Sequence, residues 1–76
     1  MSLQMEGKLQ ATFGLNLRRH REAINMSQEA FAVRMNIHRT YLGAIERGER
    51  NLTLKVVERM ADDLELDPIP LLTPSD

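Results

Sequence analysis

The stretch SQEAFAVRMNIHRTYLGAIERG, residues 27–48, decides the fold of this chain. Ser27 is a strong helix N-cap, because its hydroxyl can accept a hydrogen bond from an unpaired backbone amide. Apolar side chains then recur every three or four residues until Asn36, which tolerates the left-handed backbone that ends a helix. A second short helix begins near Arg39 and stops at Gly48. Two short helices joined by a turn of about three residues predict a helix-turn-helix unit.

The flanking sequence continues the helical spacing in both directions. A first helix is expected from about Ala11 to Ile24, with Phe13, Leu17 and Ile24 on its inner face. A fourth helix is capped by Thr53 and ends before Pro68. Its inner stripe is expected to be Leu54, Val57, Ala61 and Leu64. A fifth, single-turn helix follows within residues 69–72, so we predict an all-α, compact five-helix bundle.

Length and composition limit the chain to one small domain, because it has 76 residues and 42% hydrophobic content. We expect a flexible segment over residues 1–10, the helix-turn-helix domain with a C-terminal dimerisation element over 11–72, and a tail over 73–76. The chain has no cysteine and two histidines, so we expect no disulfide, metal or other cofactor. Apolar runs reach only four residues, far from the roughly 18 that span a bilayer, so we expect a cytoplasmic protein.

Charge is distributed unevenly along the chain, although the formal net charge is only -1. Between Arg18 and Arg50, seven arginines stand against four glutamates, which gives +3. From Leu54 to Asp76, two basic residues stand against six acidic ones, which gives -4. The overall balance therefore does not argue against a nucleic-acid partner, since the middle of the chain is basic.

Two charged residues fall on the inner faces of their predicted helices. Arg21 lies four residues after Leu17, and Glu46 lies four residues after Leu42. Charges at such positions persist when they are paired, so we predict a structural salt bridge between Arg21 and Glu46.

The outer face of the third helix carries Arg39, Thr40, Gly43, Ala44 and Arg47. Two of these residues are very small and would let the helix backbone approach another surface, while Arg39 and Thr40 could reach base edges in a DNA major groove. An ordinary solvated face is the alternative. Gln28 at a helix N-terminus and the polar loop residues Arg47, Arg50 and Asn51 could bind phosphates.

The run from Ser27 to Ala32 and the run RTYLGAIERGERNLTL, residues 39–54, resemble the Cro/C1-type (XRE) helix-turn-helix family. The resemblance covers about residues 13–72. Within that family, RTY at the start of the third helix with IERGERNLT after it is similar to the controller proteins of restriction-modification systems. The resemblance implies a phage-repressor-like five-helix domain, a homodimer on a near-palindromic DNA operator, and transcriptional regulation.

The resemblance also implies roles for individual residues. It places Arg39, Thr40 and Tyr41 against DNA, with Arg39 on a guanine edge, and it makes Gln28, Arg47 and Asn51 phosphate contacts. A packing role at the edge of the core is the alternative for Tyr41. His38 stands where an aspartate or serine is usual, and we expect it to attract phosphate as well.

The C-terminal segment is unusually apolar and is expected to form the homodimer interface through Leu66, Ile69, Leu71 and Leu72. Folding of this tail over the chain's own core is the alternative.

The sequence therefore predicts a sequence-specific transcriptional regulator, a controller of a restriction-modification operon, and no enzyme, because it has no nucleophile-base pair, carboxylate dyad or metal spacing. We expect double-stranded DNA and a second copy as partners, with no membrane and no small-molecule substrate. A phage or plasmid repressor or an antitoxin of the same fold is the nearer alternative. A protein-interaction adaptor domain is the alternative from another class.

Overall fold

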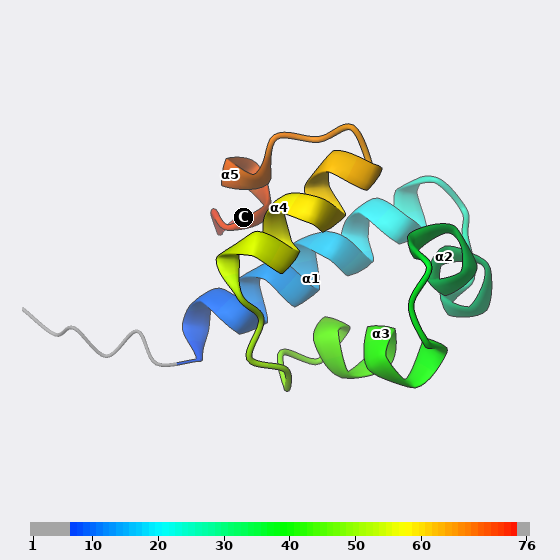
Figure 1. Ribbon diagram of the computed structural model, residues 1–76, viewed down its shortest axis with the longest axis horizontal. Coiled ribbons are helices and arrows are strands. Elements are labelled where there is room, and N and C mark those ends of the chain that lie inside the picture. Colours follow the sequence, from blue (N-terminus) through cyan, green and yellow to red (C-terminus); the bar gives the residue numbers. More distant parts are fainter. Residues whose placement is uncertain (1–6, 75–76) are drawn as a thin grey trace, which may run out of the picture.

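The computed structural model describes residues 7–74, and within this range the chain forms helices and no strands (Figure 1). α1 lies across the molecule, with α4 and α5 on one side of it and α3 on the other (Figure 1). No helix in this range is long and apolar enough to span a membrane. The helices are α1 (Lys8–Ala23), α2 (Gln28–Met35), α3 (Arg39–Glu46), α4 (Leu54–Asp63) and α5 (Pro68–Leu71). The predicted all-α, five-helix fold is confirmed.

The helix ends follow the local chemistry that the sequence predicts. The Ser27 hydroxyl accepts a hydrogen bond from the Ala30 amide at 3.1 Å, and Thr53 does the same for Val56 at 3.1 Å. Asn36 ends α2 in the left-handed conformation, with φ of 56°. These residues set where α2 begins and ends and where α4 begins, because each satisfies or redirects backbone groups that a helix end leaves unpaired.

The first helix starts earlier than the sequence predicts. α1 begins at Lys8, and Gly7 precedes it with φ of 79°. Residues 8–10 are therefore helical, which corrects the expected flexible segment over 1–10 in this part. Residues 1–6 of that segment, and residues 75 and 76 of the tail, lie outside the described range.

One hydrophobic core joins all five helices, and its largest fully buried side chains are Phe13, Leu17, Phe31, Met35, Leu42, Ile45 and Met60. Two residues that the helical spacing places inside are instead exposed. Ile24 is 38% exposed, because α1 ends at Ala23, and Leu54 is 75% exposed at the first position of α4. The spacing of apolar residues identifies the inner face of a helix. A residue at the end of that face is buried only if a neighbouring element extends far enough to cover it.

Gly14 allows α1 and α3 to approach at backbone distance. A Cβ atom at this position would lie 2.1 Å from the carbonyl oxygen of Ile45 and 2.9 Å from that of Glu46. Gly14 is buried on the same helix as Phe13 and Leu17. The absence of a side chain here therefore sets how deeply α3 sits against α1.

Asn16 connects α1 to the last helix. Its Nδ2 group donates hydrogen bonds to the carbonyl oxygens of Pro70, Leu71 and Thr73 at 3.3, 3.0 and 2.9 Å. The last carbonyls of a helix have no partner within the helix, and α5 has only four residues. The Pro70 carbonyl also accepts from the Thr73 amide at 3.2 Å, so the contribution of Asn16 is greatest at the carbonyls of Leu71 and Thr73.

The substitution Asn16→Asp is expected to destabilise the domain by about 2 kcal/mol, because it replaces a donor with a carboxylate that faces carbonyl oxygens. Urea unfolding measures the change. Asn51→Asp is the matched control: Asn51 uses its Oδ1 as the acceptor, at 3.2 Å from Gln10 Nε2, and aspartate keeps that acceptor. If Asn16→Asp and Asn51→Asp had the same urea midpoint of unfolding, the stabilising role of the Asn16 hydrogen bonds to the end of α5 would be contradicted.

Candidate nucleic-acid interface

The predicted base-reading residues lie at the exposed start of α3. Arg39 and Thr40 are exposed, while Leu42 and Ile45 of the same helix are buried in the core. The helix is thus held by its inner face and presents its N-terminal end outward.

Gly43 differs from the exposed position expected for it, because the side chains of Gln28 and Arg47 cover it. A Cβ atom at Gly43 would lie 3.2 Å from Arg47 Nη1 and 3.9 Å from Gln28 Nε2. The glycine therefore leaves room for two predicted phosphate contacts, one from α2 and one from the end of α3, to meet over the same helix face. The sequence suggests close approach at Gly43, but the groups that use the space are side chains of this chain.

Arg21 and Glu46 form the predicted ion pair. Arg21 Nε donates to Glu46 Oε2 at 2.7 Å, and Arg21 Nη2 donates to Glu46 Oε1 at 3.0 Å. The two side chains are 11% and 3% exposed. The hydrogen bond to Glu46 raises the pKa of Arg21 above its ordinary value, against the opposing effect of burial. A bidentate, nearly buried pair of this kind holds α1 against the C-terminal end of α3.

The ion pair extends to Gln28 and to the turn before α2. Gln28 Nε2 donates to Glu46 Oε1 at 2.9 Å, and Arg21 Nη1 donates to the Met26 carbonyl at 2.9 Å. The sequence predicts the Arg21–Glu46 pair but not these two additions. Glu46 therefore also fixes the side chain of Gln28 at the N-terminus of α2.

His38 caps α3 through its ring. Its Nδ1 accepts a hydrogen bond from the Thr40 amide at 3.1 Å. An imidazole that accepts at Nδ1 carries its hydrogen on Nε2, so the exposed ring retains one outward donor. The unusual residue at this position thus provides the acceptor that aspartate or serine would provide.

Tyr41 is half-buried and packs against the core, as the packing alternative expects. The Arg50 guanidinium lies over its ring, 4.8 Å from the centroid. This cation–π contact holds Arg50 beside the start of α3, and sequence spacing alone does not predict it. Tyr41 and Arg50 are nine positions apart in the sequence, and the folded loop after α3 brings them together.

The other loop residues are positioned by polar contacts at the surface. Arg47 Nε donates to Glu49 Oε1 at 3.1 Å, in a pair whose side chains are more than half exposed. Asn51 accepts a hydrogen bond from Gln10, a helical residue within the segment predicted to be flexible. The structure therefore brings Gln28, Arg47 and Arg50 to the surroundings of α3, and places Asn51 where the loop meets α1.

The predicted dimer surface is only partly presented to solvent. Ile69 is 65% exposed, and Leu66 and Leu72 are half-buried. Leu71 is 6% exposed and belongs to the core, so its expected place at a dimer interface is wrong. Within α5, Leu71 faces the core with Pro68 on the same helix face, while Ile69 faces solvent.

Comparisons with known proteins agree with this architecture. A helix-turn-helix family model matches residues 17–71. Control protein C.BamHI from Bacillus amyloliquefaciens is 39% identical over 69 residues, which cover 90% of this chain and 85% of that protein. Control protein C.SmaI from Serratia marcescens is 43% identical over 58 residues, which cover 76% of this chain and 69% of that protein.

A solved structure is similar along most of both chains. The crystal structure of the restriction-modification controller protein C.AhdI from Aeromonas hydrophila superposes with a TM-score of 0.71 at 37% identity. The match covers 82% of this chain and 94% of that chain.

Proposed function

Because the chain belongs to the Cro/C1-type (XRE) helix-turn-helix family and is a DNA-binding transcriptional regulator, we propose that it controls a restriction-modification operon. It does so as a homodimer on a near-palindromic operator upstream of the genes it regulates. Two copies of the domain place their α3 helices in successive major grooves, about 34 Å apart. Footprinting on the DNA upstream of its own gene tests this proposal: two protected half-sites one helical turn apart support it, and protection of a single half-site contradicts it.

The observation that supports this proposal most directly is the exposed pair Arg39 and Thr40 at the start of α3. Both lie in the first turn of a helix whose opposite face is buried, which is the arrangement that inserts a helix end into a major groove. Arginine can form two hydrogen bonds with a guanine edge, and the threonine hydroxyl can contact a base or the adjacent phosphate. Tyr41, held at the edge of the core, would contact DNA with the part of its ring that stays exposed.

The phosphate contacts surround this helix end. Gln28 would bind a phosphate through its side-chain amide, which Glu46 already positions. His38 would bind a phosphate through its Nε2 donor. Arg47 and Arg50 supply charge, and Asn51 would bind through Nδ2 because Gln10 occupies its Oδ1. These contacts fix the position of the domain on DNA, whereas the residues at the start of α3 select the sequence.

The substitution Arg39→Ala is expected to weaken operator binding by about 1 to 3 kcal/mol, roughly 5- to 150-fold, with little effect on random duplex. Gel shifts on operator and random DNA at matched salt measure both affinities. Arg59→Ala removes an exposed arginine from α4 and serves as the control. Equal losses on the two duplexes would show that Arg39 contacts phosphate and not a base.

The substitution Arg50→Ala is expected to weaken binding to operator and random DNA alike, because a phosphate contact carries no sequence information. The slope of log affinity against log salt concentration should become shallower by about one unit. A salt titration of both complexes measures this slope. An unchanged slope would assign Arg50 to supporting Tyr41 alone.

A further inference from the structure

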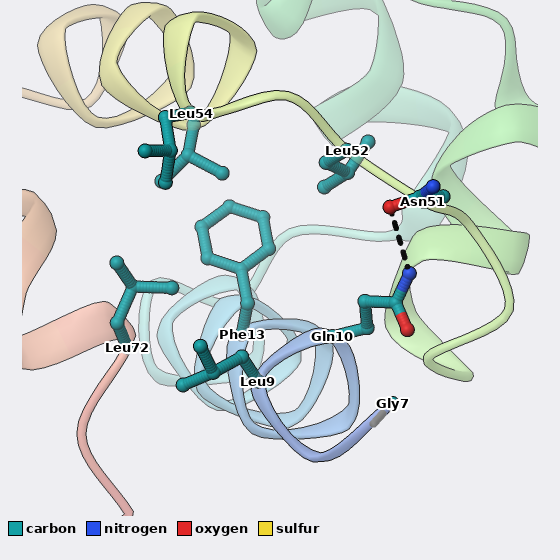
Figure 2. Close-up of a pocket in the computed structure, with 9 residues that line it drawn as sticks. Gly7, Leu9, Gln10, Phe13, Asn51, Leu52, Leu54 and Leu72 are labelled. Carbon is teal, nitrogen blue, oxygen red and sulfur yellow. Dashed lines mark hydrogen bonds between the residues drawn. The ribbon is translucent and has the colours of Figure 1, made fainter. Parts of the chain in front are cut away.

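The side chains of Gln10 and Asn51 join the first helix to the loop that follows α3. Gln10 Nε2 donates a hydrogen bond to Asn51 Oδ1 at 3.2 Å. Figure 2 shows this bond between the two side-chain amides, one on α1 and the other on the loop. Gln10 precedes residues 17–71, the part of the chain that matches the helix-turn-helix family. The bond therefore connects a residue outside that part to a loop residue inside it.

The backbone of this loop is held against α1, so the Asn51 side chain starts from a defined place. A Cβ atom at Gly48 would lie 2.9 Å from the Cα atom of Ala11, which means that the loop and the helix meet at backbone distance. Leu52, the residue after Asn51, packs against the core. The main freedom left to Asn51 is therefore the orientation of its side-chain amide.

The bond to Gln10 decides which end of the Asn51 amide is available. An asparagine amide has a donor, Nδ2, at one end and an acceptor, Oδ1, at the other. Oδ1 is occupied by Gln10, whereas Nδ2 donates to no protein group within residues 7–74, and Asn51 is exposed. A DNA phosphate oxygen accepts hydrogen bonds, so it can bind Nδ2 but not Oδ1. A reversed amide would present the wrong end to DNA.

The start of α1 sets the direction of the Gln10 amide. Gln10 is the third residue of α1, a position from which a glutamine side chain can reach back toward the residue before the helix. Its Oε1 lies on that side, because a Cβ atom at Gly7 would be 3.7 Å from it. The first backbone amides of a helix lack acceptors and carry partial positive charge, so they favour the oxygen end of a nearby side chain. Nε2 is thereby directed toward Asn51 (Figure 2).

We propose that Gln10 is a positioning residue for DNA binding, which holds the Asn51 amide with Nδ2 outward so that it donates to a DNA phosphate. The proposal rests on the phosphate contact that the proposed function gives to Asn51, and it adds the residue that orients this contact. Gln10 acts through Asn51 and does not itself contact DNA. The first turn of α1 thus affects how the loop after α3 binds the phosphate backbone.

The substitution Gln10→Glu in the full chain tests the proposal, because it keeps the shape of the side chain and removes its donor. A carboxylate beside Oδ1 makes Asn51 turn its amide, so that Nδ2 binds residue 10 and Oδ1 faces the phosphate. Binding to a duplex with one half-site and to random duplex should weaken alike, by about tenfold, because a hydrogen bond to a charged group is lost. Gel shifts at matched salt measure both affinities. The variant should remain folded, as circular dichroism checks, because glutamate is favourable in the first turn of a helix.

Two further variants separate the turned amide from the added negative charge. Lys8→Gln changes the net charge by the same amount in the same helical turn and leaves Gln10 and Asn51 in place, so it should weaken binding less than Gln10→Glu does. Asn51→Ala removes the amide that Gln10 orients. In that background Gln10→Glu should weaken binding no more than Lys8→Gln does. An equal loss from Gln10→Glu with and without the Asn51 amide overturns the proposal.

Nuclear Overhauser contacts in the free protein report the orientation of the amide without DNA. The Asn51 Nδ2 protons should give stronger contacts to the side chain of residue 10 in Gln10→Glu than in the wild type, because the amide has turned toward the carboxylate. Contacts of equal strength in the two proteins would show that residue 10 does not orient Asn51, and the proposal would fail.

These measurements distinguish a failure of the positioning role from a failure of the proposed function, because random duplex contains no operator. If footprinting shows two half-sites but Asn51→Ala binds both duplexes as the wild type does, the positioning role fails and the control of the operon stands. If footprinting shows no paired half-sites but Gln10→Glu weakens binding to random duplex only when the Asn51 amide is present, the positioning role stands and the proposed function fails.

Discussion

The substitution Gly14→Ala is expected to destabilise the domain by about 3 kcal/mol or more. The new Cβ would lie 2.1 Å from a backbone carbonyl oxygen of α3, and a backbone atom cannot rotate away as a side chain can. Relief requires α1 and α3 to separate, which would open the core around Phe13 and Leu42. The higher helix propensity of alanine, about 1 kcal/mol, offsets only part of this cost. In a domain of this size the melting temperature should fall by more than about 12 °C.

Gly43→Ala is the matched control, because it adds the same methyl group to a buried helical glycine. Its nearest contact, at 3.2 Å, is the terminal Nη1 of Arg47, which a flexible side chain can move away. We expect the melting temperature of this variant to stay within about 4 °C of the wild type. If the two variants had the same melting temperature, the close approach of α1 and α3 at Gly14 would not be the cause of the destabilisation.

The substitution Arg21→Ala is expected to destabilise the domain by about 3 to 5 kcal/mol, because the 3%-exposed carboxylate of Glu46 loses its cationic partner and keeps the hydrogen bond from Gln28. It also removes the donor to the Met26 carbonyl. Chemical denaturation measures the loss. The raised pKa of Arg21 means that its contribution is complete below the unfolded-state value and is lost only above the folded-state value. Arg21 should therefore add no pH dependence to stability between about pH 5 and 9.

A double-mutant cycle separates the ion pair from the packing around it. Replacing both partners, Arg21→Met with Glu46→Leu, should cost less than the sum of the single replacements, because no buried charge is left unpaired. Arg18→Ala is the control: its partner Glu22 lies at 3.2 Å, but both side chains are more than half exposed, so the loss should stay below about 0.5 kcal/mol. If the losses in unfolding free energy from the two single replacements simply added up in the double variant, the energetic coupling between Arg21 and Glu46 would be contradicted.

Local chemistry made much of this fold predictable. Ser27, Asn36 and Thr53 act on backbone groups within a few residues, so the sequence alone is enough to identify them as helix ends. The pairing of Arg21 with Glu46 was predictable for another reason: two charges of opposite sign on inner helix faces have few ways to avoid an unpaired state. These features require no knowledge of how the helices pack.

Features that depend on packing were harder to predict. Leu54 has the right spacing for an inner position, yet no other element within residues 7–74 covers the start of α4. Gly14 gave a usable signal, since a glycine inside a helix beside core residues often marks a close approach. The imidazole cap of His38 and the stacking of Arg50 on Tyr41 depend on side-chain geometry that sequence spacing does not encode.

The bonds from Asn16 to the end of α5 also affect the order in which the chain can fold during synthesis. They join residues 54 to 57 positions apart, so α1 is made long before the carbonyl groups that it binds. On the ribosome, α2, α3 and α4 emerge before these contacts can form. Until then, the surface of α1 around Asn16 is not covered by α5. The domain can therefore close over this part of α1 only when residues 70–73 are free to pack against it.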